Sequence, residues 1–221
     1  MFDEIAPRYD FLNHLLSFGI DCRWRRAAAR AALERRPRRI LDVATGTGDM
    51  AILLKRTCPE AEVVGLDFAP RMLRRARFKA RRAGVELALV EGDALAMPFP
   101  NGHFDALTVA FGFRNFANYE RGLAEFHRVL APGGRAVILE FPPPPRRAFG
   151  RLVRFYYHRI LPALGGLISG SPEAYRYLPE SVERFPEPEA MAAMMARAGF
   201  SPTVRLLTGG VAGLFIGDKG V

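Results

Sequence analysis

A glycine-rich loop near residue 45 is the first feature of the sequence that is suited to binding a small molecule. It reads Leu41-Asp42-Val43-Ala44-Thr45-Gly46-Thr47-Gly48-Asp49. Gly46 and Gly48 stand at the start of an expected helix, where backbone N–H groups approach a ligand without obstruction by side chains. Residues 46–51 also match the G-x-G-x-x-A dinucleotide pattern, with Asp67 about 20 residues further on. By itself, the loop leaves NAD, FAD and S-adenosylmethionine open as ligands.

Acidic residues at the loop and at the next two expected strand ends favour S-adenosylmethionine. Asp42 lies four residues before Gly46, where its carboxylate is placed to order the loop or to meet the ammonium group of this cofactor. A pyrophosphate is anionic and would be repelled there. Asp67 is placed to accept hydrogen bonds from both ribose hydroxyls, and Asp93 to hold the adenine amino group. Each acid alone is compatible with capping the next helix, but three acids beside the glycine loop predict a sulfonium-cofactor site.

The elements that must position these residues alternate between strands and helices. Strands are expected at 39–44, 61–67, 85–91, 104–110 and 135–140, and helices at 49–57, 70–83 and 118–130. This alternation predicts βαβ units and a parallel sheet with right-handed crossovers. We expect Pro132-Gly133-Gly134 to break the chain just before the fifth strand.

The C-terminal end follows a different pattern. Strands are expected at 203–207 and 211–216, joined across Thr208-Gly209-Gly210, which is a hairpin signal. A mostly parallel α/β sheet that ends in an antiparallel hairpin, with helices on both faces, resembles the Rossmann-like, seven-stranded class I methyltransferase fold, and this analogy concerns the fold alone. We expect a single domain over residues 1–221. Within it, we expect residues 1–36 to form a helical cap that includes an Arg/Ala-rich helix, and residues 142–186 to form a helical insertion over the site of the methyl acceptor.

The composition describes a basic protein with few cysteines. Its formal net charge is +9, and lysine occurs only at positions 55, 79 and 219. Such a surface serves nucleic acid, an anionic membrane or an acidic substrate, or is simply a solvated surface. Cys22 and Cys58 are too few for a disulfide framework or a zinc site, so we expect no metal and a cytoplasmic location. No apolar run approaches the roughly 20 residues that span a bilayer, and no signal peptide is evident.

The sequence resembles class I methyltransferases and, more narrowly, the ubiquinone/menaquinone biosynthesis C-methyltransferases of the UbiE/MenG type. The resemblance covers almost the whole chain. The blocks that carry it are Phe2 to Asp10 with Leu12-Asn13, Trp24-Arg25-Arg26, Leu41 to Asp49, Gly65 to Phe68 with Met72-Leu73, Gly92 to Leu95 with Pro98-Phe99, Ala110-Phe111-Gly112-Phe113-Arg114-Asn115, Arg128 to Leu130 with Pro132 to Gly134, Leu139-Glu140-Phe141, and Tyr175-Arg176-Tyr177-Leu178 through Ser181 to Phe185-Pro186. The cofactor loop is shared by many methyltransferases, whereas the 110–115 and 175–186 blocks are highly specific.

The resemblance implies methylation of a ring carbon on a polyprenylated quinol, either demethylmenaquinol or the benzoquinol precursor of ubiquinone. It implies cofactor contacts at Thr47, Asp67, Asp93 and Ala94, and with the loop reasoning we expect the S-adenosylmethionine site to comprise Asp42, Gly46, Thr47, Gly48, Asp67, Phe68, Asp93, Ala94 and Ala110.

Three residues are our candidates for catalysis. A ring carbon becomes nucleophilic when an adjacent hydroxyl loses its proton, so the protein must align the reactants, remove a proton and exclude water. Arg114, just past the fourth strand, is expected to stabilise the developing phenolate. Asn115 is expected to orient the ring, and Tyr177, with Tyr9 and His158, to contribute to the acceptor pocket. An Arg in a structural salt bridge and aromatics in the core are the competing interpretations.

Two positions depart from the family pattern. Pro142 follows Glu140-Phe141 where the family usually has Ser, and Phe215 stands in the last strand where it usually has His. If the family's His has a catalytic or pocket role, this chain lacks that role. We expect instead that the residue at this position has a packing role.

The basic residues have a membrane interpretation, because a polyprenylated substrate resides in the bilayer. Residues 146–169 combine five arginines with apolar side chains, which is typical of an interfacial helix on anionic lipid. The competing interpretation is a lid helix that packs only on the protein. We expect peripheral contact with the cytoplasmic membrane face, and a homo-oligomer is left open.

Three alternative functions remain at this point. A nucleic-acid methyltransferase fits the charge, but Ala-Phe-Gly-Phe-Arg-Asn occupies the place of the usual Asn/Asp-Pro-Pro-aromatic motif, so no nucleic-acid partner is expected. The cofactor motifs also fit a methyltransferase of another small phenol or lipid. A non-enzymatic cofactor-binding protein is disfavoured by the three retained acids.

Overall fold

The computed structural model describes residues 19–144, 150 and 180–221. In this part, a seven-stranded sheet has the strand order β3-β2-β1-β4-β5-β7-β6. The strands are β1 (Arg39–Val43), β2 (Glu62–Asp67), β3 (Ala88–Glu91), β4 (Phe104–Ala110), β5 (Leu130–Glu140), β6 (Phe200–Leu207) and β7 (Ala212–Lys219).

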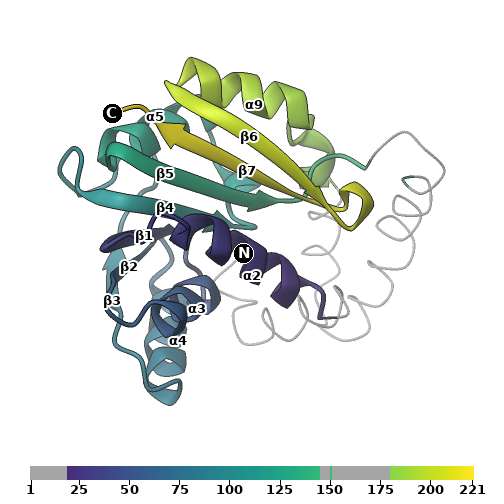
Figure 1. The fold of residues 1–221 in the computed structure, drawn as a ribbon. Helices are drawn as coiled ribbons and strands as arrows, with labels where there is room; N and C mark the ends of the chain where they lie inside the picture. The colour runs from purple at the N-terminus through teal and green to yellow at the C-terminus, as the bar shows by residue number, and fades with distance from the viewer. Residues whose placement is uncertain (1–18, 145–149, 151–179) are drawn as a thin grey trace.

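The first five strands are parallel to one another, and the last two form the predicted antiparallel pair. β1 lies between β2 and β4, with Leu41 opposite Val64 on one side and Leu107 on the other. β7 runs antiparallel to both β5 and β6. Figure 1 shows this sheet with helices on both sides. The predicted fold class is therefore confirmed. Because β1, β2, β3 and β4 are parallel, the loops at their carboxyl ends meet at one edge of the sheet.

The helices divide between the two faces. On one face, α2 (Asp21–Leu33) and α3 (Asp49–Thr57) bury alanines and apolar side chains against the sheet, and α4 (Pro70–Arg82) follows β2. On the other face, α5 (Tyr119–Val129) and α9 (Pro188–Arg197) enclose a core that contains Phe104, Phe113 and Phe126. The central strands β1, β2 and β4 are buried on both faces, and their sequences are therefore nearly continuous hydrophobic runs. No helix of the described residues is long and apolar enough to cross a membrane.

The N-terminal helix α2 is tied to the far end of the chain. Trp24 Nε1 donates to Thr208 Oγ1 at 2.9 Å, and the Trp24 ring packs edge-on against Phe111 and Phe141. At its other end, Arg135 of β5 donates to the Ala31 carbonyl, at a distance of 3.1 Å. These contacts fix α2 across β4, β5 and β7. Although the helix is rich in arginine, its alanines therefore form part of the core.

Several strands differ in their bounds from the sequence-based expectation; β6 begins three residues earlier and β7 ends three residues later. β5 begins at Leu130 rather than Arg135, so Pro132-Gly133-Gly134 does not break the strand. Leu130 pairs with Phe104 before the register shifts, and Gly133 takes a φ of +73°, which absorbs the irregularity. β3 is also shorter than expected: it begins at Ala88 rather than at residue 85, and it is an edge strand that pairs with β2.

Candidate active site

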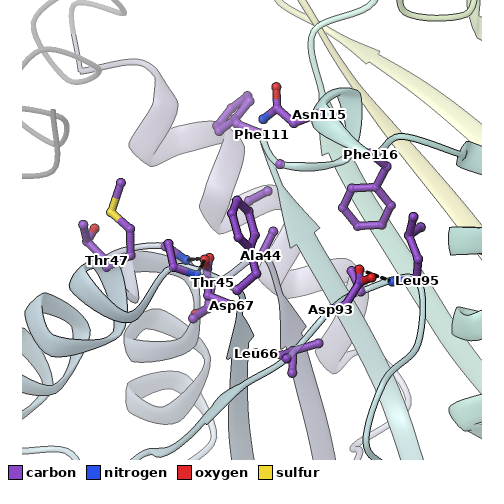
Figure 2. Close-up of a pocket in the computed structure, with 18 of the residues that line it drawn as sticks. Ala44, Thr45, Thr47, Leu66, Asp67, Asp93, Leu95, Phe111, Asn115 and Phe116 are labelled. Carbon is purple, nitrogen blue, oxygen red and sulfur yellow. Dashed lines mark hydrogen bonds between the residues drawn. The ribbon is translucent and has the colours of Figure 1, made fainter. Parts of the chain in front are cut away.

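A cavity of about 490 Å³ lies at the carboxyl edge of the sheet, where the four parallel strand ends meet (Figure 2). Its size falls within the range of small-molecule sites. The described residues that line it are Arg25, Ala44, Thr45, Gly46, Thr47, Asp49, Leu66, Asp67, Phe68, Ala69, Met72, Gly92, Asp93, Ala94, Leu95, Ala110, Phe111, Gly112, Asn115, Phe116 and Ala117. Most of the predicted cofactor residues are thus brought together.

Asp42 is hydrogen-bonded to the glycine loop and is not one of the residues that line the cavity. Its carboxylate accepts hydrogen bonds from Thr45 Oγ1 at 2.6 Å and from Thr108 Oγ1 at 2.7 Å. The residue is only 1% exposed, and this burial raises the pKa of the Asp42 carboxyl to about 6 despite the two hydroxyl donors. Of the two predicted roles for Asp42, these contacts fit the ordering of the loop and not contact with a ligand.

The loop itself adopts a conformation that favours glycine. Gly46 has a φ of +57° and Gly48, which precedes α3, a φ of +86°. Gly48 is not one of the lining residues: a Cβ there would lie 3.0 Å from the Ala76 Cβ, so this glycine lets α3 and α4 approach closely. Thr47 does line the cavity, and the Lys79 ammonium of α4 donates to its Oγ1 at 3.1 Å and to Asp49 Oδ1 at 2.5 Å.

Asp67 joins the loop to the end of β2. One carboxylate oxygen accepts from the Gly46 N–H at 2.7 Å and the other from the Ala69 N–H at 2.9 Å. The side chain lines the cavity, as Figure 2 shows, and the residue is 7% exposed. Phe68, next to it, is 66% exposed at the same cavity. A carboxylate held by two backbone donors is a preorganised acceptor for hydroxyl groups.

Asp93 follows β3, the strand next to β2 in the sheet, and lies on the side of the cavity opposite Thr47 (Figure 2). Its Oδ1 accepts from the Leu95 N–H at 2.8 Å, and Asp93 and Ala94 both line the cavity. The predicted adenine-binding position of Asp93 therefore lies at the same cavity as Asp67.

The loop after β4 forms the remaining wall. Ala110, Phe111, Asn115 and Phe116 line the cavity, and Phe111 has a φ of +61°, a conformation unusual for a bulky residue. Phe111 stacks on Phe141 with ring centroids 4.5 Å apart. Aromatic rings thus cover this side, in contrast to the acidic side near β2 and β3.

Arg114, the predicted electrostatic catalyst, is not one of the residues that line the cavity. Its Nη1 lies 2.9 Å from Glu140 Oε1 and donates to the Phe111 carbonyl at 2.5 Å, and its Nε donates to Ser181 Oγ at 3.3 Å. The Arg114 and Glu140 side chains are 7% and 0% exposed. Within the described residues, Arg114 is thus held by a buried carboxylate and by the Phe111 carbonyl, and it does not line this cavity. Its predicted contact with the acceptor stays a prediction.

The other sequence candidates have mixed outcomes. Asn115 lines the cavity as expected. Tyr177, Tyr9 and His158 lie outside the described residues, as does the basic segment 146–169. Phe215, which replaces a family His, is fully buried beside Phe185, with ring centroids 5.9 Å apart, and has a packing role. Within the described ranges, no group of three or more potential metal ligands is gathered.

Sequence reasoning missed Arg25 as a cavity residue. It lies on α2, far along the chain from the glycine loop, and its guanidinium carbon stands 5.2 Å from the centre of the Phe111 ring. The Trp24-Arg25-Arg26 block contains three large side chains, and only the helix position reveals that Arg25 faces the cavity.

Comparisons with known proteins agree with this geometry. Residues 1–219 match the model of the ubiE/COQ5 methyltransferase family. A demethylmenaquinone methyltransferase of Thermus thermophilus is 66% identical, over 99% of this chain and 100% of the relative. One of Deinococcus radiodurans is 58% identical, over 99% and 91%, and a ubiquinone/menaquinone biosynthesis C-methyltransferase UbiE of Geobacter sulfurreducens is 48% identical, over 100% and 88%.

Solved structures share the fold at low sequence identity. A SAM-dependent methyltransferase from Aquifex aeolicus has a TM-score of 0.60 and 18% identity, over 81% of each chain. A putative methyltransferase from Bacillus halodurans has a TM-score of 0.60 and 19% identity, over 83% of this chain and 93% of that one. With the full-length family match and the strand-end cavity, the chain belongs to the ubiE/COQ5 methyltransferase family.

Proposed function

We propose that this protein transfers a methyl group from S-adenosylmethionine to a ring carbon of a polyprenylated quinol. Demethylmenaquinol is the first choice of acceptor, and the benzoquinol precursor of ubiquinone is the second. The observation that carries the proposal is the cavity at the sheet edge, with strand-end acids on one side and aromatic rings on the other. The names of the relatives at 66% and 58% identity support the first acceptor, and the name of the relative at 48% supports the second as well.

The acidic side of the cavity fits the donor. Asp67, already held by two backbone N–H groups, offers its carboxylate to the ribose hydroxyls, and Asp93 faces the adenine side. Gly46 and Thr47 leave room for the amino-acid part beside the loop. When bound, the donor supplies an electrophilic methyl group on a cationic sulfur. The nearby carboxylates favour this positive charge electrostatically.

The aromatic side of the cavity fits the acceptor. Phe111 and Phe116 present apolar rings that pack against a quinol and exclude water. Asn115 offers an amide that can hydrogen-bond a ring hydroxyl and fix the carbon in line with the methyl group. Arg114 holds this wall through the Phe111 carbonyl. The role of Tyr177 stays a prediction.

The experiment that tests this function uses purified protein, S-adenosylmethionine labelled in its methyl group, and short-chain acceptors. We expect label transfer to reduced demethylmenaquinol and none to the oxidised quinone, because only the quinol ring is nucleophilic. An Asp67→Ala variant, which lacks the carboxylate of the donor site, is the matched control and should lose transfer. Label transfer only to nucleic acid or to a soluble phenol would contradict the quinol assignment.

The proposed substrate resides in a membrane, so we also propose peripheral binding to an anionic bilayer surface from the cytoplasmic side. The exposed face of α4 supports it and carries Arg71, Arg74, Arg77, Phe78, Arg81 and Arg82. Phe78 is 62% exposed, and the helix contains no acidic residue. Exposed arginines around an apolar side chain are typical of a surface that binds anionic lipid.

Flotation with vesicles tests this binding. We expect the protein to float with vesicles that contain about a third phosphatidylglycerol, and salt to release it, because screening weakens exposed charges. A variant with Arg74, Arg77 and Arg81 changed to Gln should bind less than a control with Arg23, Arg26 and Arg30 of α2 changed to Gln. Equal flotation of the two variants would place the contact elsewhere, and absence of salt-sensitive binding by the wild type would refute it.

A further inference from the structure

The charges around the cavity are unevenly distributed. Among the described residues that line it, three are acidic, Asp49, Asp67 and Asp93, and one is basic, Arg25. The proposed donor carries two cationic groups, the sulfonium and the α-ammonium, and one anionic group, the α-carboxylate. The acidic residues attract the two cationic groups of the donor. They repel its α-carboxylate, which therefore requires a positively charged side chain close by. Arg25 is the lining residue able to supply it.

Arg25 is held at the cavity by two contacts. Its Nε lies 3.7 Å from Asp21 Oδ2, one helical turn earlier, and its guanidinium carbon lies over the Phe111 ring. The side chain is 14% exposed. Nevertheless, Nε has no hydrogen-bond acceptor within the part of the chain that the structure describes. A largely buried guanidinium is stabilised by an anion that accepts its N–H groups, so this position favours an anionic ligand.

The strand order places Arg25 at the correct end of the donor. Along the sheet edge, the order β3-β2-β1-β4 brings Asp93, Asp67, the glycine loop and Phe111 one after another. Figure 2 shows Asp93 and Thr47 on opposite sides of Asp67. A nucleoside held at Asp93 and Asp67 therefore extends its amino-acid part toward β1 and β4. Arg25, over Phe111, lies on that side.

Lys79 is another basic group, within the part of the chain that the structure describes, that lies beside the glycine loop. Its ammonium donates to Asp49 and Thr47 and is not one of the lining residues, so its charge is directed to the loop. By holding Asp49, it reduces the negative charge that a carboxylate would meet beside the loop. Arg25 is thus the group placed to meet the ligand itself.

We propose that Arg25 binds the α-carboxylate of S-adenosylmethionine and so selects donors that carry an intact amino-acid end. This proposal rests on the proposed function, since it assumes that donor. A guanidinium hydrogen-bonded to a carboxylate is strong and charge-assisted, so its loss should weaken the binding of a carboxylate-bearing ligand in particular.

The test is a comparison of three ligands by isothermal titration calorimetry: S-adenosylmethionine, decarboxylated S-adenosylmethionine, and 5′-methylthioadenosine. We expect Arg25→Gln to weaken binding of S-adenosylmethionine about tenfold to a hundredfold, which is the range for a hydrogen bond to a charged group. Binding of the two ligands without the carboxylate should change less than about twofold. Arg25→Lys should be intermediate, because it keeps the charge but loses the fork of donors.

Each other outcome has a distinct meaning. Arg26→Gln, one residue on and exposed, is the matched control and should bind all three ligands as the wild type does. Equal weakening of all three ligands by Arg25→Gln would overturn the proposal in favour of a structural role for α2. Unchanged donor affinity with a raised KM for the acceptor would overturn it in favour of phenolate recognition. If the wild-type protein bound none of the ligands, the proposed function itself would fail.

Discussion

The buried carboxyl of Asp42 makes the stability of this protein depend on pH in a defined direction. The side chain accepts two hydroxyl hydrogen bonds, and burial raises its pKa from 3.8 to about 6. Folding therefore favours the protonated form of this group. Its contribution to stability is fully present below pH 3.8 and is lost as the pH rises through about 6.

The magnitude follows from the same values. The difference between 3.8 and about 6, at 1.36 kcal/mol for each pH unit, corresponds to about 3 kcal/mol. Asp42→Asn is nearly isosteric and uncharged at every pH, so it removes the loss of folding stability that ionisation of Asp42 causes in the wild type. Relative to the wild type, the variant should gain about 3 kcal/mol in free energy of unfolding between about pH 4 and about pH 7.

Urea denaturation of both proteins at several pH values between about 4 and 8 measures this change. All other titrating groups are shared, so the difference between the two proteins isolates Asp42. The altered hydrogen bonds to Thr45 and Thr108 add an offset of about 1 kcal/mol that does not depend on pH. A difference that stays constant across this range would refute the reasoning, and one that falls with pH would mean that a cation stabilises the carboxylate.

Three further perturbations test the walls of the cavity. Arg114→Ala leaves the Glu140 carboxylate buried without its guanidinium, so urea denaturation should show a loss of about 3–5 kcal/mol; a loss below about 1 kcal/mol would mean that the pair is not structural. Gly112→Ala places a Cβ 2.7 Å from the Ala44 Cβ, and calorimetry should show weaker S-adenosylmethionine binding, whereas unchanged affinity would show that the loop yields freely. Lys79→Met removes two hydrogen bonds to the glycine loop and should weaken donor binding severalfold, with a melting temperature only a few degrees lower. Lys55→Met, at a site away from the cavity, is the control and should leave the affinity for the donor unchanged.

The fold was predictable because its signals are local. The run at 104–110 follows Asn101-Gly102-His103 and matches β4 residue for residue. The start of β5 was not predictable, since Pro132 and Gly133 signal a break and only the pairing of Leu130 with Phe104 continues the strand. That pairing joins residues distant in the chain, which a local pattern does not encode.

The same distinction applies to the site. Asp67 and Asp93 were predictable because each follows a strand, and parallel strands end at one edge. The environment of Arg114 was not, because its partner Glu140 lies 26 residues further on and becomes a neighbour only through the pairing of β4 with β5. Arg25 was missed for a related reason: α2 contacts the sheet through tertiary packing alone, and arginines also cover its solvent side.

The hydrogen bond from Trp24 to Thr208 joins residues 184 positions apart, and it bears on how the protein is made. During translation, α2 leaves the ribosome early, but the hairpin that anchors it is among the last segments to emerge. Arg25 is the next residue after Trp24, so its placement at the cavity depends on a hairpin that is translated almost two hundred residues later.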